Sequence, residues 1–471
     1  MRLRCAIANG LWLASASRDA RAFRANLHRV AEVQRAMVGD VEAFRERWPI
    51  RKFDELRPPL CPLCLCGENP RASREACSHS PQRHRDTEGD GAFVLHEPVE
   101  RWMTTSGSSG AKKSIPYTRT LRHEFDRAIA PWIVSLFRTE PRAFAGEAYW
   151  SISPGAESDE EILGPVQRRL VRAVQAVPSS VRLTNENFRE ETLRHLMRCR
   201  TLSLISVWHP SFLDLLVGDI DTEKTWPHLR VISCWADANA AAPAAALAKK
   251  FPHAKIQPKG LLSTEGFVSI PFDGANVLAY RSHFYEFRDG EDVRLAHELE
   301  IGKRYCVILT TGGGLRRYDT EDIVEVTGYR EQAPILKFIG RANHVSDHFG
   351  EKLNEIFVRE RLAAALRDVP HAFAMLACDR DAYVLYIETE AAVDAAAVDA
   401  LLRESHHYDL ARRLGQLAPL RVMRVHNGAV TYLRAKSASQ TLGDIKIPAL
   451  DREQGWSERF SDASSDVAAR S

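Results

Sequence analysis

The sequence predicts an α/β fold, with a large N-terminal domain of β-sheets covered by helices and a smaller C-terminal α+β domain. One observation is the length of 471 residues, because a domain usually holds about 100 to 200 residues. A second is that short β-rich runs between Leu202 and Val326 alternate with an alanine-rich helical segment, Ala240–Lys250, as in a sheet covered by helices. A third is a hairpin pattern that lies between helical segments after residue 340.

The N-terminal half opens with helices. Ser17 to Trp48 carries apolar residues at three- and four-residue spacings without proline, which favours amphipathic helices, and Thr120 to Phe137 and Glu161 to Val177 repeat that spacing. Residues 57–91 are instead rich in Pro, Cys, Arg and Ser. We interpret them as an atypical surface loop or insertion.

The C-terminal part alternates helical and strand patterns. We place the domain boundary near Gly340, which gives domains of residues 1–340 and 341–450 and a polar tail, residues 451–471, that we expect to be disordered. The elements predicted in the smaller domain are a helix over Glu351–Ala365, a hairpin of Ala372–Cys378 and Tyr383–Ile387, a helical stretch over Ala391–Leu414, and strands over Leu420–Val425 and Ala429–Leu433.

Composition excludes several classes of protein. With 64 Lys and Arg against 62 Asp and Glu the net charge is only +2, so we expect no nucleic-acid partner. No apolar run approaches the roughly 20 residues of a membrane-spanning helix, and we expect no membrane association. Five of the nine cysteines are widely scattered, which argues against a disulfide framework and favours the reducing cytoplasm. We expect a monomer or a weak dimer.

A glycine-rich loop, Thr105 to Lys113 (TSGSSGAKK), carries the first chemical signal. Glycine lets backbone N–H groups turn towards an anion, hydroxyl groups add donors, and lysine supplies countercharge, so the loop predicts phosphate binding. Its spacing is not that of a Walker loop. The alternative is a flexible Gly/Ser linker, although linkers seldom end in Lys-Lys followed shortly by Ile115-Pro116-Tyr117.

This loop resembles the nucleotide-binding motif of the auxin-responsive Gretchen Hagen family of acyl-acid amido synthetases, a branch of the adenylate-forming ligases. Further segments resemble bacterial members of that family in the same order: Ala148–Pro154, Ser206–Pro210, Trp226–Ala236, Gly260–Gly266 and Gly443–Lys446. The resemblance spans nearly the whole chain except residues 57–91 and the tail. It implies a large adenylation domain and a small, mobile C-terminal lid.

The resemblance also implies an activity. The family uses ATP and Mg²⁺ to convert a small carboxylic acid to acyl-AMP, and an amine, usually of an amino acid, then attacks the activated carbonyl. In this chain Ser106, Gly107, Ser108, Ser109, Gly110 and Lys113 would bind the triphosphate, whose departing pyrophosphate needs electrostatic stabilisation.

Two further motifs of the family have counterparts here. Thr264 would face the AMP phosphate as a catalytic residue, and Glu265, also catalytic, would help to hold Mg²⁺ through hard oxygen ligation. Considered alone, Glu265 is more often a capping or solvated residue. In the third motif Asp322 is the expected ribose anchor, because a carboxylate can accept bonds from both sugar hydroxyls. Asp319 and Glu321 replace the family's arginine and glycine, which puts the turn geometry in doubt.

Two basic residues follow in the C-terminal half. Arg341 aligns with the segment before the mobile domain and would contact ribose or phosphate. Lys446 resembles the catalytic lysine that this domain brings to the active site, where its charge would neutralise the acid's carboxylate and the α-phosphate. Without the resemblance, Lys446 is simply an exposed lysine.

Aromatic residues suggest where the acid binds. Tyr149, Trp208 and Trp235 could wall an acyl pocket, since sites for small molecules are mostly apolar with few polar anchors. Buried core aromatics are an equally good explanation. The identity of the acid does not follow from them.

Residues 57–91 contain Cys61, Cys64, Cys66 and Cys77 with His79 and His84, which are ligand types for tetrahedral zinc. The second Cys-x-x-Cys pair of an ordinary zinc ribbon is missing, so a variable loop is the favoured interpretation.

Two other functions stay open. One is an acyl-CoA ligase, which shares the acyl-AMP intermediate. The other is a catalytically impaired nucleotide-binding protein, for which the replacements at Asp319 and Glu321 are the main support.

Overall fold

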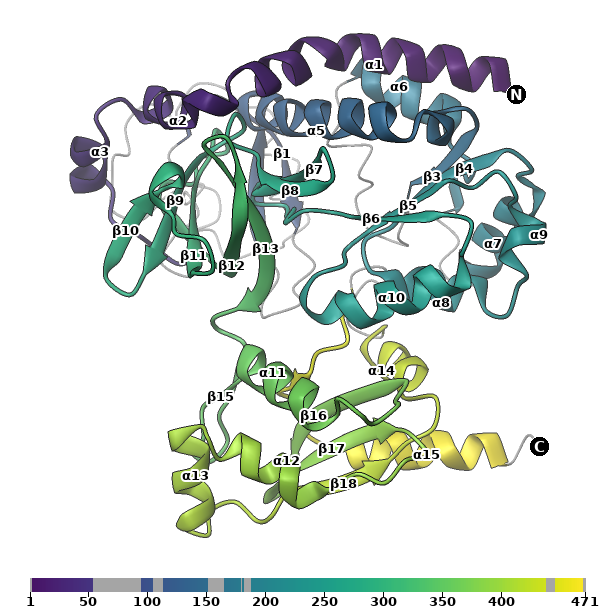
Figure 1. Ribbon diagram of the computed structural model, residues 1–471, viewed down its shortest axis with the longest axis vertical. Coiled ribbons are helices and arrows are strands. Elements are labelled where there is room, and N and C mark those ends of the chain that lie inside the picture. Colours follow the sequence, from purple (N-terminus) through teal and green to yellow (C-terminus); the bar gives the residue numbers. More distant parts are fainter. Residues whose placement is uncertain are drawn as a thin grey trace, which may run out of the picture.

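The computed structural model describes residues 2–53, 95–104, 113–150, 165–178, 180–181, 188–437 and 445–468. An antiparallel sheet and a parallel sheet, with their helices, form most of the N-terminal part. A further four-stranded sheet lies in the C-terminal part (Figure 1). The predicted α/β class with a large N-terminal and a smaller C-terminal part is thereby confirmed. No helix in the described ranges is long and apolar enough to cross a membrane.

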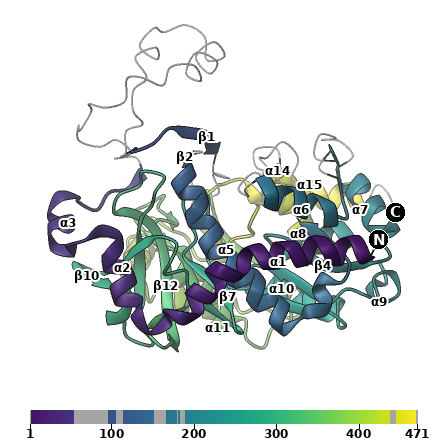
Figure 2. The same cartoon turned by 90° about the horizontal axis from the view of Figure 1, so that it is seen from above.

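Long helices cover the top of the N-terminal part. α1 (Arg2–Ala25) lies against α5 (Arg119–Thr139) and α6 (Pro165–Val174), as Figures 1 and 2 both show. Trp12 of α1 is buried there with an edge-on contact to Trp150, their ring centroids 5.9 Å apart. α2 (Val30–Val38) and α3 (Val41–Arg47) continue the helical opening that the sequence predicts.

A seven-stranded antiparallel sheet forms one half of the N-terminal part. Its buried face contributes most of the largest apolar core, together with α1 and α5. In spatial order its strands are β10 (Asp292–Leu295), β9 (Phe284–Asp289), β11 (Arg304–Thr310), β12 (Tyr318–Arg330), β13 (Ala333–Arg341), β8 (Ala275–Leu278) and β7 (Ser269–Phe272).

A four-stranded parallel sheet forms the other half. Its central strands are wholly buried, as expected where helices cover both faces of a parallel sheet. The strands are, in order, β3 (Glu147–Trp150), β4 (Leu202–Ser206), β5 (Val231–Cys234) and β6 (Lys255–Pro258), and the neighbouring helices are α7 (Phe188–Arg198), α8 (Pro210–Val217), α9 (Thr222–Thr225) and α10 (Ala241–Lys250).

The C-terminal sheet buries both faces. Alternate residues of β16 (Phe373–Asp379) and β17 (Ala382–Glu388) enter two different apolar clusters, because successive side chains of a strand point to opposite sides. α11 (Glu355–Ala365), α12 (Ala395–Leu402) and α13 (His406–Arg413) contribute to one cluster, and α14 (Gly428–Ser437) and α15 (Trp456–Ala468) to the other. The remaining strands are β18 (Arg421–Arg424), β19 (Leu450–Asp451), β14 (Val345–Ser346) and β15 (Leu353–Asn354).

Two predictions for this part are wrong. Ala429–Leu433, predicted as a strand, lies inside α14, where Tyr432 stacks on Trp456 at a ring-centroid distance of 4.9 Å. Residues 456–468 of the tail predicted to be disordered form α15, since Trp456 and Phe460 lie one helical turn apart and bury one face of the helix against the sheet. The predicted hairpin of residues 372–378 and 383–387 is confirmed as β16 and β17. The domain boundary near Gly340 stays a prediction.

Candidate active site

The ends of the glycine-rich loop are held by a short hairpin. β1 (Val99–Thr104) pairs with β2 (Ser114–Thr118), and Thr104 opposes Ser114 across the two strands. Ser106, Gly107, Ser108, Ser109 and Gly110 lie outside the described residues, and so does the cysteine-rich segment 57–91.

Lys113, the last residue of the loop, reaches the third motif. Its Nζ donates to the hydroxyl of Tyr318 at 2.9 Å and lies 5.2 Å from the ring centroid of Phe53. Tyr318 is buried at the start of β12, and its main chain pairs with Arg51. Three segments far apart in the sequence therefore meet at this lysine.

Asp322, which is buried, forms an ion pair with the half-buried Arg341 beside Tyr318. They oppose each other on β12 and β13, and Arg341 Nε donates to Asp322 Oδ1 at 2.8 Å. The carboxylate of Asp322 and, less strongly, that of Glu265 raise the pKa of the Arg341 guanidinium. Burial raises the pKa of Tyr318, and the negative charge of Glu265 raises it further. The structure thus brings Lys113, Glu265, Asp322 and Arg341 into one charged neighbourhood. An Arg-paired carboxylate keeps lone pairs for a further donor.

The two departures from the family motif have separate structural roles. Asp319 accepts from Arg288 Nη2 at 2.7 Å and from the Glu321 N–H at 2.8 Å, so its carboxylate is used within the sheet. Glu321 stands at φ +61°, the left-handed conformation that glycine adopts without steric cost. Its carboxylate pairs with Lys52 Nζ at 2.9 Å and accepts from Asn343, and these contacts offset part of that cost.

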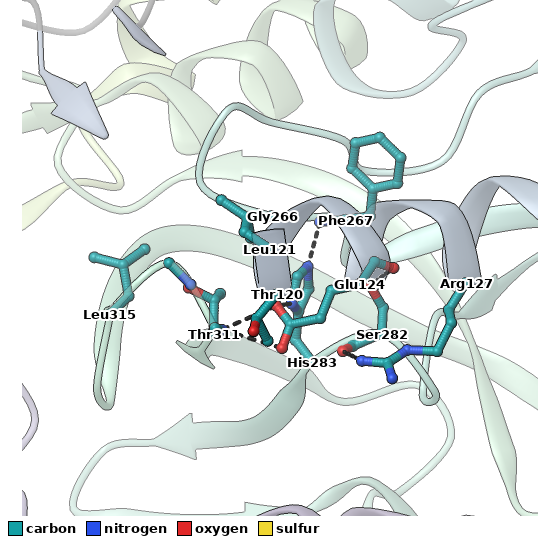
Figure 3. Close-up of polar contacts among 12 residues, drawn as sticks. Thr120, Leu121, Glu124, Arg127, Gly266, Phe267, Ser282, His283, Thr311 and Leu315 are labelled. Carbon is teal, nitrogen blue, oxygen red and sulfur yellow. Dashed lines mark hydrogen bonds and ion pairs between the residues drawn. The ribbon is translucent and has the colours of Figure 1, made fainter. Parts of the chain in front are cut away.

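A buried network supports the segment that carries Thr264 and Glu265 (Figure 3). Phe267, just after them, donates its N–H to His283 Nε2 at 3.2 Å, so the proton of the neutral ring lies on Nδ1 and is donated to Glu124 Oε2 at 2.9 Å. Glu124 also accepts from the Gly312 N–H at 2.9 Å. The network therefore ties the second motif and the loop before the third motif to α5, the helix that follows the glycine-rich loop.

Glycines let these three segments approach closely. A Cβ on Gly266 would lie 2.6 Å from Leu309 Cδ2, and one on Gly312 would lie 2.3 Å from Thr120 Cγ2. A side chain on Gly312 would press against Thr120 of α5, and one on Gly266 would press against Leu309 and His283. This close approach is the reason for glycine here.

Lys446 lies against Trp235, the residue that follows β5 of the parallel sheet. Its Nζ is 4.1 Å from the ring centroid of Trp235, whose ring is 5.4 Å from that of Trp208. Lys259 Nζ lies 4.2 Å from the Trp208 ring centroid. Tyr149 is instead fully buried in the core of the parallel sheet, which fits the core interpretation better than a pocket wall.

Lys446 and Trp235 line a cavity of about 60 Å³ between the N-terminal and C-terminal parts. Asp237 and Phe338 line it from the N-terminal part, and the Phe338 N–H donates to Asp237 Oδ2 at 3.2 Å. His209 lines it too, at the end of β4. The predicted pocket residue Trp235 thus faces a cavity with the predicted catalytic lysine.

Two regions of the chain match models of one family. Residues 276–341 match the GH3 family central domain, and residues 362–454 match the GH3 family C-terminal domain. These two regions of the chain thus resemble two consecutive domains of the GH3 family. The predicted family is thereby confirmed.

Curated GH3 relatives match parts of the chain. It is 29% identical over 180 residues to indole-3-acetic acid-amido synthetase GH3.8 of Oryza sativa subsp. indica, an alignment that covers 32% of this chain and 29% of that protein. It is 36% identical over 98 residues to indole-3-acetic acid-amido synthetase GH3.2 of Arabidopsis thaliana, covering 21% and 17%. The matched segments span less than a third of the length of either relative.

Solved structures share the fold along almost the whole chain. AtGH3.15 acyl acid amido synthetase in complex with 2,4-DB superposes with a TM-score of 0.70 at 15% identity, covering 94% of this chain and 93% of that one. A 2-hydroxyisobutyryl-CoA ligase in the postadenylation state, in complex with 2-HIB-AMP, gives a TM-score of 0.51 at 15% identity, covering 96% and 91%. At these identities the likeness concerns the fold.

Sequence reasoning missed several residues of this candidate site. Glu124 and His283 are 159 positions apart and belong to no motif, so only the fold brings them together. His209 was within reach, because a histidine directly before Pro210 stands where a helix cap is expected. Among the described residues no cluster of three or more His, Cys, Asp or Glu could enclose a metal ion.

Proposed function

We propose that this GH3 protein is an ATP-dependent ligase that activates a small carboxylic acid as acyl-AMP and transfers the acyl group to an amine, an amino acid in the first instance. The convergence of Lys113, Asp322 and Arg341 around Tyr318 carries this proposal. A lysine, an arginine and a carboxylate in one partly exposed site match the phosphates and the ribose of a nucleotide. The names of the GH3 relatives, which are amido synthetases, support the reaction type.

The two steps divide the work among these residues. In the first, a carboxylate oxygen attacks the α-phosphorus of ATP and the bond to pyrophosphate breaks. In the second, the amine nitrogen attacks the acyl carbon, the bond to AMP breaks and the nitrogen loses a proton. Lys113 and the glycine-rich loop bind the triphosphate, Asp322 and Arg341 the nucleoside end, and Lys446 the reacting carboxylate.

Mg²⁺ fits the donors that are present. It is usually held by one or two carboxylates together with substrate phosphates, and the buried carboxylate of Glu265 suits that arrangement. We therefore propose Glu265 as its protein ligand. Bound there, the ion would neutralise phosphate charge, and Thr264 would contact the AMP phosphate.

Pyrophosphate exchange tests the first step. A panel including indole-3-acetic acid, 2,4-DB and 2-hydroxyisobutyrate is supplied with ATP and labelled pyrophosphate, and at least one acid should support exchange. Folded protein that supports exchange with no acid in a broad panel would contradict the proposal.

Two variants of one strand provide a matched comparison. Asp322 and Asp319 both lie on β12 and each pairs with an arginine. Asp322→Asn should raise the KM for ATP by about tenfold or more, because hydrogen bonds to a charged group are worth about 1.5–3 kcal/mol. Asp319→Asn should leave that KM within about twofold. Equal effects would show that the loss is structural.

The acceptor separates this proposal from a second one. The shared fold with a CoA ligase keeps thioester formation as the alternative. Amino acids or coenzyme A added after adenylation give products of different mass. ATP binding without pyrophosphate release would favour the remaining hypothesis, a catalytically impaired nucleotide-binding protein.

The location, partners and oligomeric state of the protein are also proposals. We propose a cytoplasmic protein without nucleic-acid or membrane partners that is a monomer or a weak dimer. Size-exclusion chromatography over a range of concentrations tests the last point.

A further inference from the structure

His209 occupies the junction between β4 and α8. It is the N-cap of α8, and its Nδ1 accepts the Ser211 N–H at 3.3 Å, while Pro210 fills the first helical position. An N-cap side chain accepts a hydrogen bond from an otherwise unsatisfied N–H of the first turn. One nitrogen of the ring therefore has a structural task.

That task fixes the proton on the other nitrogen. Because Nδ1 uses its lone pair for Ser211, the neutral ring carries its hydrogen on Nε2. Burial and the nearby charge of Lys446 lower the pKa of His209 to about 3, so the ring is neutral near pH 7. His209 thus presents a constant N–H donor.

This donor has no partner within the described part of the chain. His209 is 1% exposed, and Nε2 is buried without a hydrogen bond. Buried polar groups are nearly always paired, and a helix cap alone needs only an acceptor, which Ser, Asp or Asn would supply. The fold of α8 therefore does not account for Nε2–H.

His209 lies close to Lys446, the residue proposed to bind the carboxylate of the acid. His209, Trp235 and Lys446 line the same small cavity. An acceptor oxygen in that cavity would be within range of both an ammonium and a neutral imidazole N–H. Neutral imidazole can act in this way, holding a carbonyl or carboxylate oxygen without donating its proton outright.

We propose that His209 donates from Nε2–H to an oxygen of the bound acid substrate next to Lys446, so that the cavity takes the carboxylate end of the acid and not its hydrocarbon portion. This inference rests on the proposed adenylation reaction. It adds a second role to a residue whose other nitrogen caps α8.

Two substitutions separate the two nitrogens. Asn places its amide oxygen near the position of Nδ1, so His209→Asn keeps a good cap but removes the donor. Gln places its amide nitrogen near the position of Nε2, so His209→Gln keeps a donor and weakens the cap. In pyrophosphate exchange, His209→Asn should raise the KM for the acid about tenfold, with the KM for ATP and the melting temperature close to those of the wild type.

The Gln variant should show the reverse pattern. Its KM for the acid should stay within a few-fold of the wild type, while its melting temperature falls. A His209→Asn protein with an unchanged KM for the acid would overturn this inference alone, provided that the wild type supports exchange. Equal rises of the KM for the acid in both variants would also overturn it, because the effect would then come from loss of the imidazole ring and not from loss of the Nε2–H donor. A wild type that activates no acid would overturn the proposed function together with it.

Discussion

Glu321 holds a backbone conformation that glycine would adopt more easily. Its φ of +61° costs an ordinary residue about 1–2 kcal/mol relative to right-handed backbone. Ion pairing with Lys52 and a hydrogen bond from Asn343 act in the opposite direction. The hydrogen bond and the negative charge of Glu321 also raise the pKa of Lys52.

Two substitutions at this position should therefore differ in stability. Glu321→Gly removes the backbone cost along with the contacts, so we expect a melting temperature near that of the wild type. Glu321→Ala removes the contacts and keeps the backbone cost, so its melting temperature should be lower than that of Glu321→Gly by several degrees. Thermal unfolding followed by circular dichroism compares them. Equal melting temperatures would show that the left-handed conformation is not costly here.

His209 should make the protein sensitive to acid. A histidine whose folded pKa is lowered to about 3 contributes stability that is present above its unfolded pKa of about 6.5 and is lost as the pH falls towards 3. His209→Asn should therefore lose less unfolding free energy than the wild type between pH 7 and pH 4 in urea titrations.

The other charged groups at the cavity are the same in both proteins. Lys259 and Lys446 line the cavity in both, and Asp237, whose pKa burial raises, works against the trend of His209. Parallel pH profiles for wild type and His209→Asn would contradict the assignment of a neutral, buried ring.

At the scale of elements, α5 is the part that joins the motifs. Its first turns carry Glu124, which binds both His283 and the Gly312 N–H, and Thr120, which packs against Gly312. α5 begins directly after β2, the strand that closes the glycine-rich loop. A displacement of α5 would therefore move the second and third motifs together.

Glu124→Gln tests this link with little change in shape. A carboxylate accepts from two donors here, whereas an amide would present an N–H group to one of them. We expect a rise of about tenfold in the KM for ATP along with some loss of stability.

Asp394→Ala is the control for stability alone, since Asp394 caps α12 and lies far in the sequence from the residues proposed to bind the nucleotide. It should lower the melting temperature and leave the KM for ATP unchanged. A Glu124→Gln protein that behaves in the same way would limit Glu124 to a structural role.

At the scale of the whole molecule, the C-terminal part reaches the parallel sheet through a few contacts. Lys446 Nζ lies over Trp235, and Asn239 Nδ2 donates to Glu355 Oε1 at 2.6 Å. These contacts join the cavity at Trp235 to α11. The position of Lys446 therefore depends on how the two parts are joined.

Lys446→Ala should lower the rate of pyrophosphate exchange by about a hundredfold or more, because loss of one preorganised charge-stabilising group commonly has that effect. ATP binding, measured by calorimetry, should change little. Lys436→Ala is the matched control: Lys436 also lies over a tryptophan, Trp456, but pairs with Asp451 within the C-terminal part. An equal loss in both variants would contradict a direct role for Lys446.

The sequence allowed the class of fold and the family to be predicted, since both rest on local patterns, whereas the roles of the site residues stay predictions. Lys113, Asp322 and Arg341 lie in motifs, and the structure brings them together. Pairing across long sequence distances, such as Glu124 with His283, leaves no local pattern. Residues 429–433 were misassigned for a related reason, because tertiary packing of Tyr432 outweighs the strand preference of its neighbours.

The burial of α15 limits how far this protein can be shortened. Trp456 and Phe460 complete the apolar layer on one face of the C-terminal sheet, beside Phe373 and Tyr386. A protease cut before residue 456 would leave that layer open to water and invite self-association. The same cut would loosen the C-terminal sheet next to Lys446. Removal of α15, which carries none of the proposed catalytic residues, should therefore still slow the proposed formation of acyl-AMP.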